Sequence, residues 1–354
     1  MGAVTTSFVH DALPMRVVFG PGRLAELGEE VARLGPRRVL VLGTPEQGAT
    51  LQRAVDGLGD RAAGVFAEAR QHVPAEIAAA AADRARELDA DGCVAVGGGS
   101  SVGLGKAVAL RHGLPAVAVP TTYAGSEMTP IWGLTEDGVK RTGRDRAVLP
   151  RSVVYDPELT LTLPVGLSVT SGLNAVAHAV EALWAPDGTP ITAVMAEEGA
   201  RSLLAALPAV VDRPDDLDAR SGALQGAWLC GAVLGATTMS LHHKLCHVLG
   251  GSYGLPHAET HAVVLPHVVA HNAPGAPAAV AALGRALGAG ADADAVTKAL
   301  ATEARDLGAP TSLAAIGMPR EGLPDVVEQV LAAPYANPVP VTRESLTALL
   351  DAAF

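Results

Sequence analysis

Short apolar runs alternate with amphipathic stretches over the first 155 residues of the chain. The short runs are bounded by Gly, Pro and charged residues, as buried strands are, whereas the longer stretches repeat their apolar residues with helical spacing. The predicted strands are Arg16–Phe19, Arg38–Leu42, Ala62–Phe66, Gly92–Val96 and Pro115–Val119. The predicted helices are Gly22–Leu34, Glu46–Leu58, Ala75–Leu88 and Val102–Arg111. This alternation predicts a parallel α/β sheet that binds ligands at the carboxyl ends of its strands.

The pattern changes after the segment Val154-Tyr155-Asp156-Pro157. Ala- and Leu-rich helical runs follow, interrupted by Gly and Pro, and little strand pattern remains. A chain of 354 residues is long enough to build two cores. We therefore predict an α/β nucleotide-binding domain over residues 1–155 and an all-helical substrate domain over residues 156–354, with a hinge near Asp156–Pro164.

Composition narrows the class of protein. Hydrophobic residues make up 49% of the chain and charged residues 18%, which is typical of a well-buried globular protein. The net charge of −11 argues against a nucleic-acid surface, although it is compatible with a local cationic pocket for an anionic small molecule. The three cysteines are widely spaced, so we expect reduced thiols and a cytoplasmic protein. We expect neither a membrane segment nor a signal peptide, because the required apolar patterns are missing.

A glycine-rich turn follows the fourth predicted strand. The turn contains Gly97, Gly98, Gly99, Ser100 and Ser101, and a helix begins there. An ordinary strand-to-helix turn needs one glycine, whereas three let the backbone approach a pyrophosphate, whose charge the helix N-terminus favours. The spaced glycines of the Rossmann pattern are absent. The turn therefore predicts a dinucleotide site of a different kind.

A second polar loop follows the next strand. It carries the candidate contacts Thr121, Thr122, Gly125 and Ser126. We expect these residues to reach the same diphosphate, and turn chemistry alone is the alternative explanation. The second strand ends at Gly43, a further candidate cofactor contact, and no carboxylate follows before Glu46. Because an acidic residue there would bind the ribose hydroxyls and repel a 2′-phosphate, both NADH and NADPH stay open as cofactors.

Histidines are concentrated in the C-terminal half of the chain. Seven of the eleven fall between residues 242 and 271. His243 and His247 lie one helical turn apart, and His257 starts a further predicted helix. Asn174 and His178 have the same spacing on an earlier, otherwise apolar helix. A hydrogen-bonded core histidine would explain one such pair, but two pairs favour a ligand site.

These motifs resemble those of the iron-containing alcohol dehydrogenase superfamily, whose members share a dehydroquinate-synthase-like fold. The resemblance covers essentially the whole chain, and within the superfamily the best match is to the maleylacetate reductases. The segments that carry this match are Gly97–Lys106, Tyr123–Thr135 and Leu241–His247. The superfamily pattern reads Asp-x-x-x-His, then His-x-x-x-His, then Pro-His. Its metal ligands would map onto Asn174, His178, His243 and His257, and His247 would lie near the nicotinamide.

The chain departs from the superfamily pattern at two positions. Asn174 stands where the pattern has an acidic ligand, and Gly103 stands where the phosphate loop carries Asp. A neutral amide holds a divalent cation less well than a carboxylate, although three imidazoles can still hold zinc. Resemblance to the maleylacetate reductases implies NAD(P)H-dependent reduction, and we expect that no metal is required. On this hypothesis, histidine charge and hydrogen bonding polarise the substrate in place of a cation.

The same resemblance implies maleylacetate, an enone flanked by two carboxylates, as the substrate. Hydride would add to the alkene carbon β to the ketone, and negative charge would build on the ketone oxygen. We expect His178, His243 and His257 to stabilise that charge, while a histidine or water supplies the proton. Three further candidates are His247 at the nicotinamide, Asn174 as an orienting residue and Tyr123 as a secondary donor.

The two substrate carboxylates call for cationic partners. The candidates nearest to the motifs are Arg144, Lys106, Lys140 and Lys244. For each of them a solvated surface charge is an equally good explanation. We rank Arg144 first, because its planar fork suits a carboxylate and the neighbouring Gly143 indicates a loop.

Three other functions fit parts of the pattern. A metal-dependent alcohol or aldehyde dehydrogenase would share the fold, but Asn174 argues against it. A cyclising lyase such as dehydroquinate synthase would need a firmly bound metal and a cluster of Lys and Arg for a phosphate substrate. A non-enzymatic binding module would leave the histidines unexplained. The resemblance also implies a homodimer.

Overall fold

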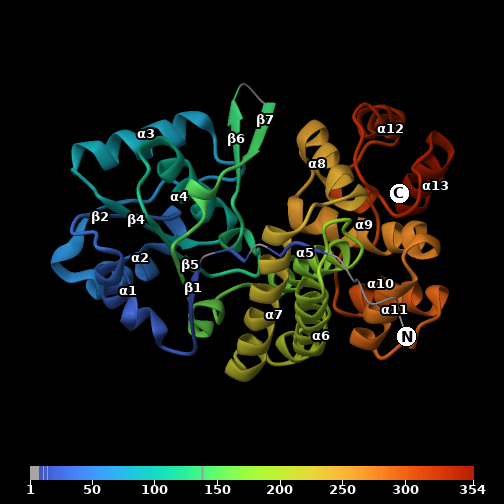
Figure 1. Ribbon diagram of the computed structural model, residues 1–354, viewed down its shortest axis with the longest axis horizontal. Helices are drawn as coiled ribbons and strands as arrows, with labels where there is room; N and C mark the ends of the chain where they lie inside the picture. Colours follow the sequence, from blue (N-terminus) through green and yellow to red (C-terminus); the bar gives the residue numbers. More distant parts are fainter. Residues whose placement is uncertain (1–7, 11, 14, 137–138) are drawn as a thin grey trace. The chain divides into compact units, whose positions relative to one another are not determined.

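The computed structural model describes residues 8–10, 12–13, 15–136 and 139–354. The chain forms two compact units, Leu13–Leu163 and Pro164–Phe354, and the described residues before Leu13 belong to the second. In Figure 1 the strands all belong to the first unit, coloured blue to green, and the second unit is helical. Residues 156–163 belong with the sheet, because Leu159 is part of the apolar core on one of its faces. The transition between the units therefore lies at Leu163–Pro164, at the end of the predicted hinge.

The first unit is built on a six-stranded sheet in which every neighbouring pair of strands is parallel. Its strands are β1 (Arg16–Phe19), β2 (Val39–Leu42), β3 (Ala62–Phe66), β4 (Gly92–Gly97), β5 (Ala116–Pro120) and β8 (Ser152–Tyr155). Their order across the sheet is β1-β8-β5-β4-β2-β3. The predicted parallel α/β fold is confirmed. The sequence pattern did not predict β8, which lies between β1 and β5.

Helices cover both faces of this sheet. On one face η1 (Arg23–Glu26), α1 (Leu27–Leu34) and α2 (Gly48–Leu58) share a core with Val39 and Val41 of β2. On the other face α3 (Ala75–Glu87) and α4 (Gly99–His112) share a core with Leu40 and Leu42. Successive residues of a strand point to opposite faces, so an unbroken apolar run such as β2 is buried on both sides. The sheet is therefore the middle layer of three, and loops occupy its carboxyl edge.

An antiparallel hairpin, β6 (Ile131–Glu136) and β7 (Val139–Arg144), follows β5 along the chain. The sequence pattern did not predict this hairpin. Arg144, which we expected in a loop beside Gly143, is instead paired with Ile131. Gly143 is needed for space, because a Cβ at this position would lie 2.5 Å from the Trp132 ring. The glycine therefore marks close packing within a strand rather than a turn.

The second unit is all-helical throughout its described residues, as predicted. Its helices are α5 (Val165–Leu183), α6 (Pro190–Asp212), α7 (Leu217–Ala236), α8 (Leu241–Tyr253), α9 (His257–Asn272), α10 (Pro277–Leu287), α11 (Ala293–Asp306), α12 (Leu323–Leu331) and α13 (Arg343–Ala353). α5 packs against α6, α7 and α9 and is buried from Ser168 to Ala182. Polar side chains on so buried a helix require partners, and Asn174, His178 and Glu181 are three such side chains. Across the described part of the chain, every helix lacks the length or the apolar character that a membrane crossing needs.

Candidate active site

The glycine-rich turn lies at the carboxyl end of β4, where α4 begins. Gly97 has φ +136°, and a Cβ there would lie 2.4 Å from both Gln47 Oε1 and Ser101 Oγ. Glycine alone fits this backbone conformation and this space. At Gly98, a Cβ would lie 3.0 Å from the Thr122 side chain. The backbone of the turn is therefore packed closely against residues that follow β2 and β5.

The loop after β5 lies beside this turn, because β4 and β5 are neighbours in the sheet. Thr121 N–H donates to the Gly97 carbonyl oxygen over 3.1 Å, and Gln47 Nε2 donates to Thr121 Oγ1 over 2.9 Å. Three buried polar atoms in these described loops have no partner in the protein: Gln47 Oε1, Ser101 Oγ and Thr122 Oγ1. Buried polar groups are nearly always hydrogen-bonded, so these atoms indicate a polar ligand. Sequence reasoning missed Gln47, whose signal is its place just after β2 at the same sheet edge.

The remaining predicted cofactor residues occupy the same edge. Gly99 and Ser100 form the first turn of α4. Gly43 follows β2, where a Cβ would lie 2.5 Å from Leu51 Cδ2. Ser126 begins the short η4 turn (Ser126–Met128) in the loop after β5. The fold thus brings together the loops that follow β2, β4 and β5.

Lys106 of α4 is almost fully buried and holds the loop after β5. Its Nζ donates to the carbonyl oxygens of Ser126 (2.6 Å) and Ile131 (2.7 Å) and to Thr129 Oγ1 (2.9 Å). Burial lowers the pKa of Lys106 to about 7, although the negative charge of Glu127 raises it. An ammonium whose N–H groups are all used inside the protein has none left for a substrate. The expectation that Lys106 binds a substrate carboxylate is therefore wrong, and Lys106 instead positions the loop.

The other residues proposed as proton donors or as partners of the substrate carboxylates lie on different elements of the fold. Arg144 is exposed on β7, and Lys140 lies on the same strand with its side chain outside the described residues. Lys244 is half-buried on α8, directly after His243. Tyr123 is fully buried in the loop after β5. Their roles stay predictions.

Histidines from three helices of the second unit converge. We call them the histidine cluster: His178 on α5, His242, His243 and His247 on α8, and His257 and His261 on α9. The His243 ring centroid lies 5.1 Å from that of His178 and 5.0 Å from that of His261. His247 and His257 are exposed, whereas the other four are buried. The cluster therefore has a buried centre and two members that solvent reaches.

Glu181 of α5 anchors one side of this cluster. Its Oε2 lies 2.6 Å from His243 Nδ1 and accepts the Ser240 backbone N–H over 3.0 Å, while Oε1 accepts the His242 backbone N–H over 2.9 Å. Burial alone would raise the pKa of Glu181, but these hydrogen bonds hold it below its usual range. The carboxylate thus stabilises the N-terminus of α8 and keeps the His243 proton on Nδ1, which leaves Nε2 a lone pair. The sequence analysis assigned Glu181 no role, although its position three residues after His178 puts it on the same face of α5.

Burial keeps His178, His242 and His261 neutral. It lowers the pKa of His178 and His261 well below the usual range and that of His242 to about 3, and neighbouring histidines lower all three further. A neutral imidazole presents a lone pair, so near pH 7 these rings offer ligand atoms rather than positive charge. This corrects the hypothesis that imidazole charge polarises the substrate.

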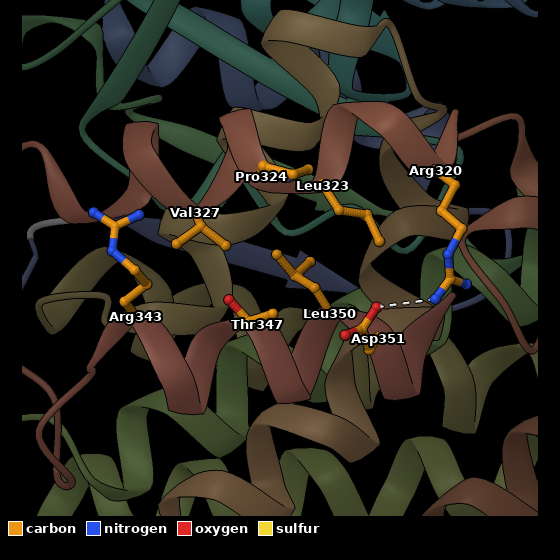
Figure 2. Close-up of a pocket in the computed structure, with 8 residues that line it drawn as sticks. All are labelled: Arg320, Leu323, Pro324, Val327, Arg343, Thr347, Leu350 and Asp351. Carbon is orange, nitrogen blue, oxygen red and sulfur yellow. Dashed lines mark hydrogen bonds and ion pairs between the residues drawn. The ribbon is translucent and has the colours of Figure 1, made fainter.

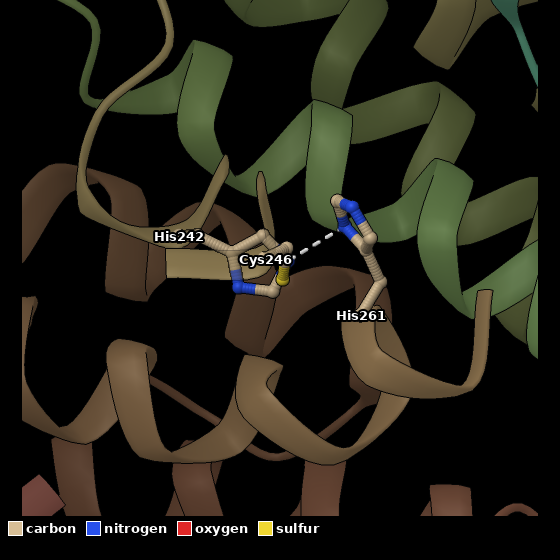
Figure 3. A group of neighbouring side chains, drawn as sticks. All are labelled: His242, Cys246 and His261. Atoms are coloured by element: carbon tan, nitrogen blue, oxygen red, sulfur yellow. Dashed lines mark hydrogen bonds between the residues drawn. The ribbon is translucent and has the colours of Figure 1, made fainter. Parts of the chain in front are cut away.

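His242, Cys246 and His261 place their ligand atoms within 4.8 Å of one another (Figure 3). His242 Nε2 and His261 Nδ1 share a hydrogen bond of 2.9 Å, and Cys246 Sγ lies 3.8 Å from His242 Nε2. Burial raises the pKa of the Cys246 thiol well above its usual range, so the thiol stays protonated and is a poor metal ligand. We therefore interpret His242 and Cys246 as hydrogen-bonding partners that hold the His261 ring in place.

A groove of about 410 Å³ lies between α12 and α13 (Figure 2). Apolar side chains such as Leu323 and Val327 line it, and the ion pair of Arg320 and Asp351, 3.3 Å long, lies at one end. The groove is lined by none of the predicted site residues that the structure describes. The candidate sites are therefore the cofactor loops of the first unit and, separately, the histidine cluster of the second.

Two family models match the chain. One, described as iron-containing alcohol dehydrogenase, matches residues 14–157. The other, described as the C-terminal part of the Fe-containing alcohol dehydrogenase family, matches residues 168–354. Both descriptions name iron. The expectation that no metal is required is therefore wrong, because the family implies one.

The histidine cluster contains unpartnered atoms of the chemical type that binds such a metal. Asn174 Oδ1, His178 Nδ1, His243 Nε2 and His261 Nε2 are buried and have no partner in the protein. Imidazole nitrogen is a good ligand for iron and zinc, and three histidines suffice for a catalytic ion with an open position. The amide of Asn174 is a weaker ligand than the carboxylate it replaces, so the nitrogens supply most of the affinity.

The chain is similar to named proteins along nearly its whole length. It is 54% identical to a maleylacetate reductase of Sphingobium indicum over 98% of this chain and 97% of that protein. A solved maleylacetate reductase from Agrobacterium tumefaciens is 50% identical, with a TM-score of 0.94 and 99% of each chain covered. An iron-containing alcohol dehydrogenase from Corynebacterium glutamicum is 43% identical, with a TM-score of 0.93 and 99% of this chain and 97% of that chain covered. The chain therefore belongs to the iron-containing alcohol dehydrogenase family.

Proposed function

We propose that this chain uses NADH or NADPH to reduce the C=C bond of maleylacetate, giving 3-oxoadipate. The observation that carries the proposal is the 54% identity to a maleylacetate reductase over 98% of the chain. The unpartnered buried atoms of the cofactor loops and of the histidine cluster support it, because such atoms indicate ligands. We place the reaction in the degradation of aromatic compounds.

The loops after β2, β4 and β5 would bind the dinucleotide. The N-terminus of α4 favours the negative charge of a pyrophosphate. Ser101 Oγ and Thr122 Oγ1 would donate to phosphate oxygens, and Gln47 Oε1 would accept from a hydroxyl group. Between Gly43 and Glu46 the chain has no carboxylate that would repel a 2′-phosphate, so we propose that both cofactors are accepted.

Reduction of the enone requires a hydride and a proton. The negative charge that develops after hydride addition and before protonation must also be stabilised. A bound dihydronicotinamide would supply the hydride, and a metal held by Asn174, His178, His243 and His257 would supply a Lewis acid for the ketone. The hydride forms a C–H bond at the carbon β to the ketone, and the electron pair of the C=C bond moves toward the ketone oxygen as an enolate. A proton added at the α carbon restores the ketone, so one hydride and one proton are consumed.

The residues of the cluster have distinct roles in this scheme. Glu181 keeps the proton of His243 on Nδ1 and so directs the Nε2 lone pair to the ligand. His247 is exposed one turn further along α8, so we propose it for the nicotinamide-side contact and, with water, for supply of the proton. Tyr123 is retained as a secondary donor. Arg144 is our first candidate for a substrate carboxylate, followed by Lys140 and Lys244.

We also propose that the protein is a cytoplasmic homodimer that binds no nucleic acid. Its three cysteines are buried and free, which suits a reducing compartment. The net charge of −11 disfavours contact with a polyanion. Light scattering after size-exclusion chromatography should give about twice the chain mass of 35.8 kDa. A mass equal to one chain would contradict the dimer.

The proposed function is tested by following NADH and NADPH oxidation with maleylacetate and, separately, with simple aldehydes. We expect one cofactor oxidised per maleylacetate and 3-oxoadipate as the product by mass spectrometry. Efficient aldehyde reduction without reaction of maleylacetate would instead support a metal-dependent alcohol dehydrogenase. Product formation without net cofactor oxidation would point to a lyase.

A further inference from the structure

We propose that His261 is a ligand of the metal in this chain and compensates for the amide of Asn174. The set of ligands implied by the family pattern is Asn174, His178, His243 and His257, and it does not include His261. This inference rests on the proposed function only in assuming that the histidine cluster binds a metal. It does not depend on maleylacetate being the substrate.

His261 lies at the centre of the histidine cluster. Its ring centroid is close to those of four other histidines: 4.4 Å for His257, 4.8 Å for His242, 5.0 Å for His243 and 6.3 Å for His178. The side chain is fully buried, and its Nε2 has no partner in the protein. Leaving such an atom unpaired destabilises the fold, and a bound metal would remove this penalty. His243 Nε2 and His178 Nδ1 are unpaired in the same cluster.

The hydrogen bond to His242 prepares His261 for this role. A ring nitrogen that binds metal carries no proton, so His261 would keep its proton on Nδ1. That proton would be donated to His242 Nε2, 2.9 Å away, and His242 would then carry its own proton on Nδ1. Glu181 accepts from His243 Nδ1 in the same way. Metal-bound histidines nearly always have such an outer partner, and here both rings have one on the side away from their unpaired nitrogen.

Asn174 explains why an extra ligand is useful. An aspartate at this position would bring a negative charge, whereas the amide oxygen is neutral and binds transition metals weakly. A further imidazole restores affinity without restoring the charge. Because all the ligands are then neutral, the ion keeps its two positive charges. Such a site favours a dianionic substrate over an uncharged aldehyde.

The test is a Co²⁺ titration of chelator-treated protein, with the affinity measured by competition and the ligand field by visible absorption. We expect His261→Gln to weaken Co²⁺ binding by about 10–100-fold and to change the visible bands. His267→Gln is the matched control, because His267 lies half-buried on the same helix and outside the cluster. In the His261→Gln background, Asn174→Asp should recover affinity. Wild-type affinity and an unchanged spectrum in His261→Gln would overturn the proposal.

A second measurement needs no variant. Crystals of the wild-type protein loaded with Co²⁺ should show an anomalous peak within coordination distance of His261 Nε2. A peak coordinated by His178, His243 and His257, with His261 outside, would also overturn the proposal. Neither readout involves maleylacetate, so a protein that binds Co²⁺ through His261 but fails to reduce maleylacetate would contradict the proposed function alone.

Discussion

His243 Nδ1 lies 2.6 Å from Glu181 Oε2, and the same carboxylate accepts backbone N–H groups at the start of α8. One buried acid therefore orients an imidazole of the cluster and fixes the end of the helix that carries it. Because the acid is on α5 and the imidazole on α8, their contact also joins the two helices. Stability and ligand binding should consequently depend on the same group.

Glu181→Gln should lower both the stability of the fold and its affinity for metal. Glutamine keeps the shape of the side chain but removes the negative charge that pairs with His243 and the helix end. We expect the free energy of unfolding to fall by about 1–3 kcal/mol, measured by denaturant titration. Co²⁺ affinity should fall about tenfold or more, as expected when the outer partner of a ligand is lost. Glu198→Gln on α6, an exposed partner of Arg201, serves as the control and should change neither quantity.

Asn174→Asp should raise the affinity of the histidine cluster for divalent metal. The added carboxylate supplies a charged ligand one helical turn from His178, and we expect a gain of about tenfold or more, equivalent to 1.4 kcal/mol. Competition titration with Co²⁺ or Zn²⁺ measures the change. Asn174→Leu, which has a similar volume and lacks the oxygen, should show no gain. Equal affinities for the aspartate variant and the wild type would remove Asn174 from the metal site.

Ser101→Ala should weaken cofactor binding without weakening the fold. Ser101 Oγ is buried with no partner in the protein, so its removal breaks no internal hydrogen bond. We expect KM for NAD(P)H to rise about 3–10-fold, the value of one hydrogen bond, while Tm stays the same or rises. Ser152→Ala is the matched control, because Ser152 is equally buried but donates to Glu30 over 2.9 Å. That variant should lose stability and keep its KM.

Lys106 should give the free energy of unfolding a distinct pH dependence. Its pKa is about 7 in the folded protein and near the ordinary 10.5 when unfolded, so the unfolded chain holds more protons between these values. Stability should therefore rise with pH above 7, by up to about 1.4 kcal/mol per pH unit. Lys106→Met should lose this rise, which denaturant titrations between about pH 7 and 9 would show. Glu127 and Tyr155, which are buried nearby, are present in both proteins, so the difference between the two isolates Lys106. Parallel pH profiles would contradict the assignment.

Much of the sheet could be predicted because its strands are continuous apolar runs. β2 is such a run, buried on both faces, and is bounded by charged residues and by Gly43. β8 could not be predicted in this way. Its place depends on pairing with β1, more than a hundred residues away in sequence, and it follows a polar hairpin. Gly143 was misread because local sequence does not reveal that Trp132 occupies the space beside it.

The part of the candidate site that depends on sequence spacing within one helix could be predicted. Asn174 and His178 share a helix face, and so do His243 and His247, whatever surrounds them. The central place of His261 depends on how α8 and α9 pack, which brings its Nδ1 within 2.9 Å of His242. The neutral state of the imidazoles depends on burial, which sequence spacing does not show. The hypothesis of a cationic pocket failed for that reason, whereas the expectation that no metal is required is contradicted by the family.

The fate of a labelled hydride tests the central claim most directly. Maleylacetate is reduced with NADH carrying deuterium at the transferred position, and the product is examined by NMR. The proposed function predicts deuterium at the methylene carbon β to an intact ketone. Deuterium at a new carbinol carbon, with the C=C bond retained, would show carbonyl reduction and contradict it.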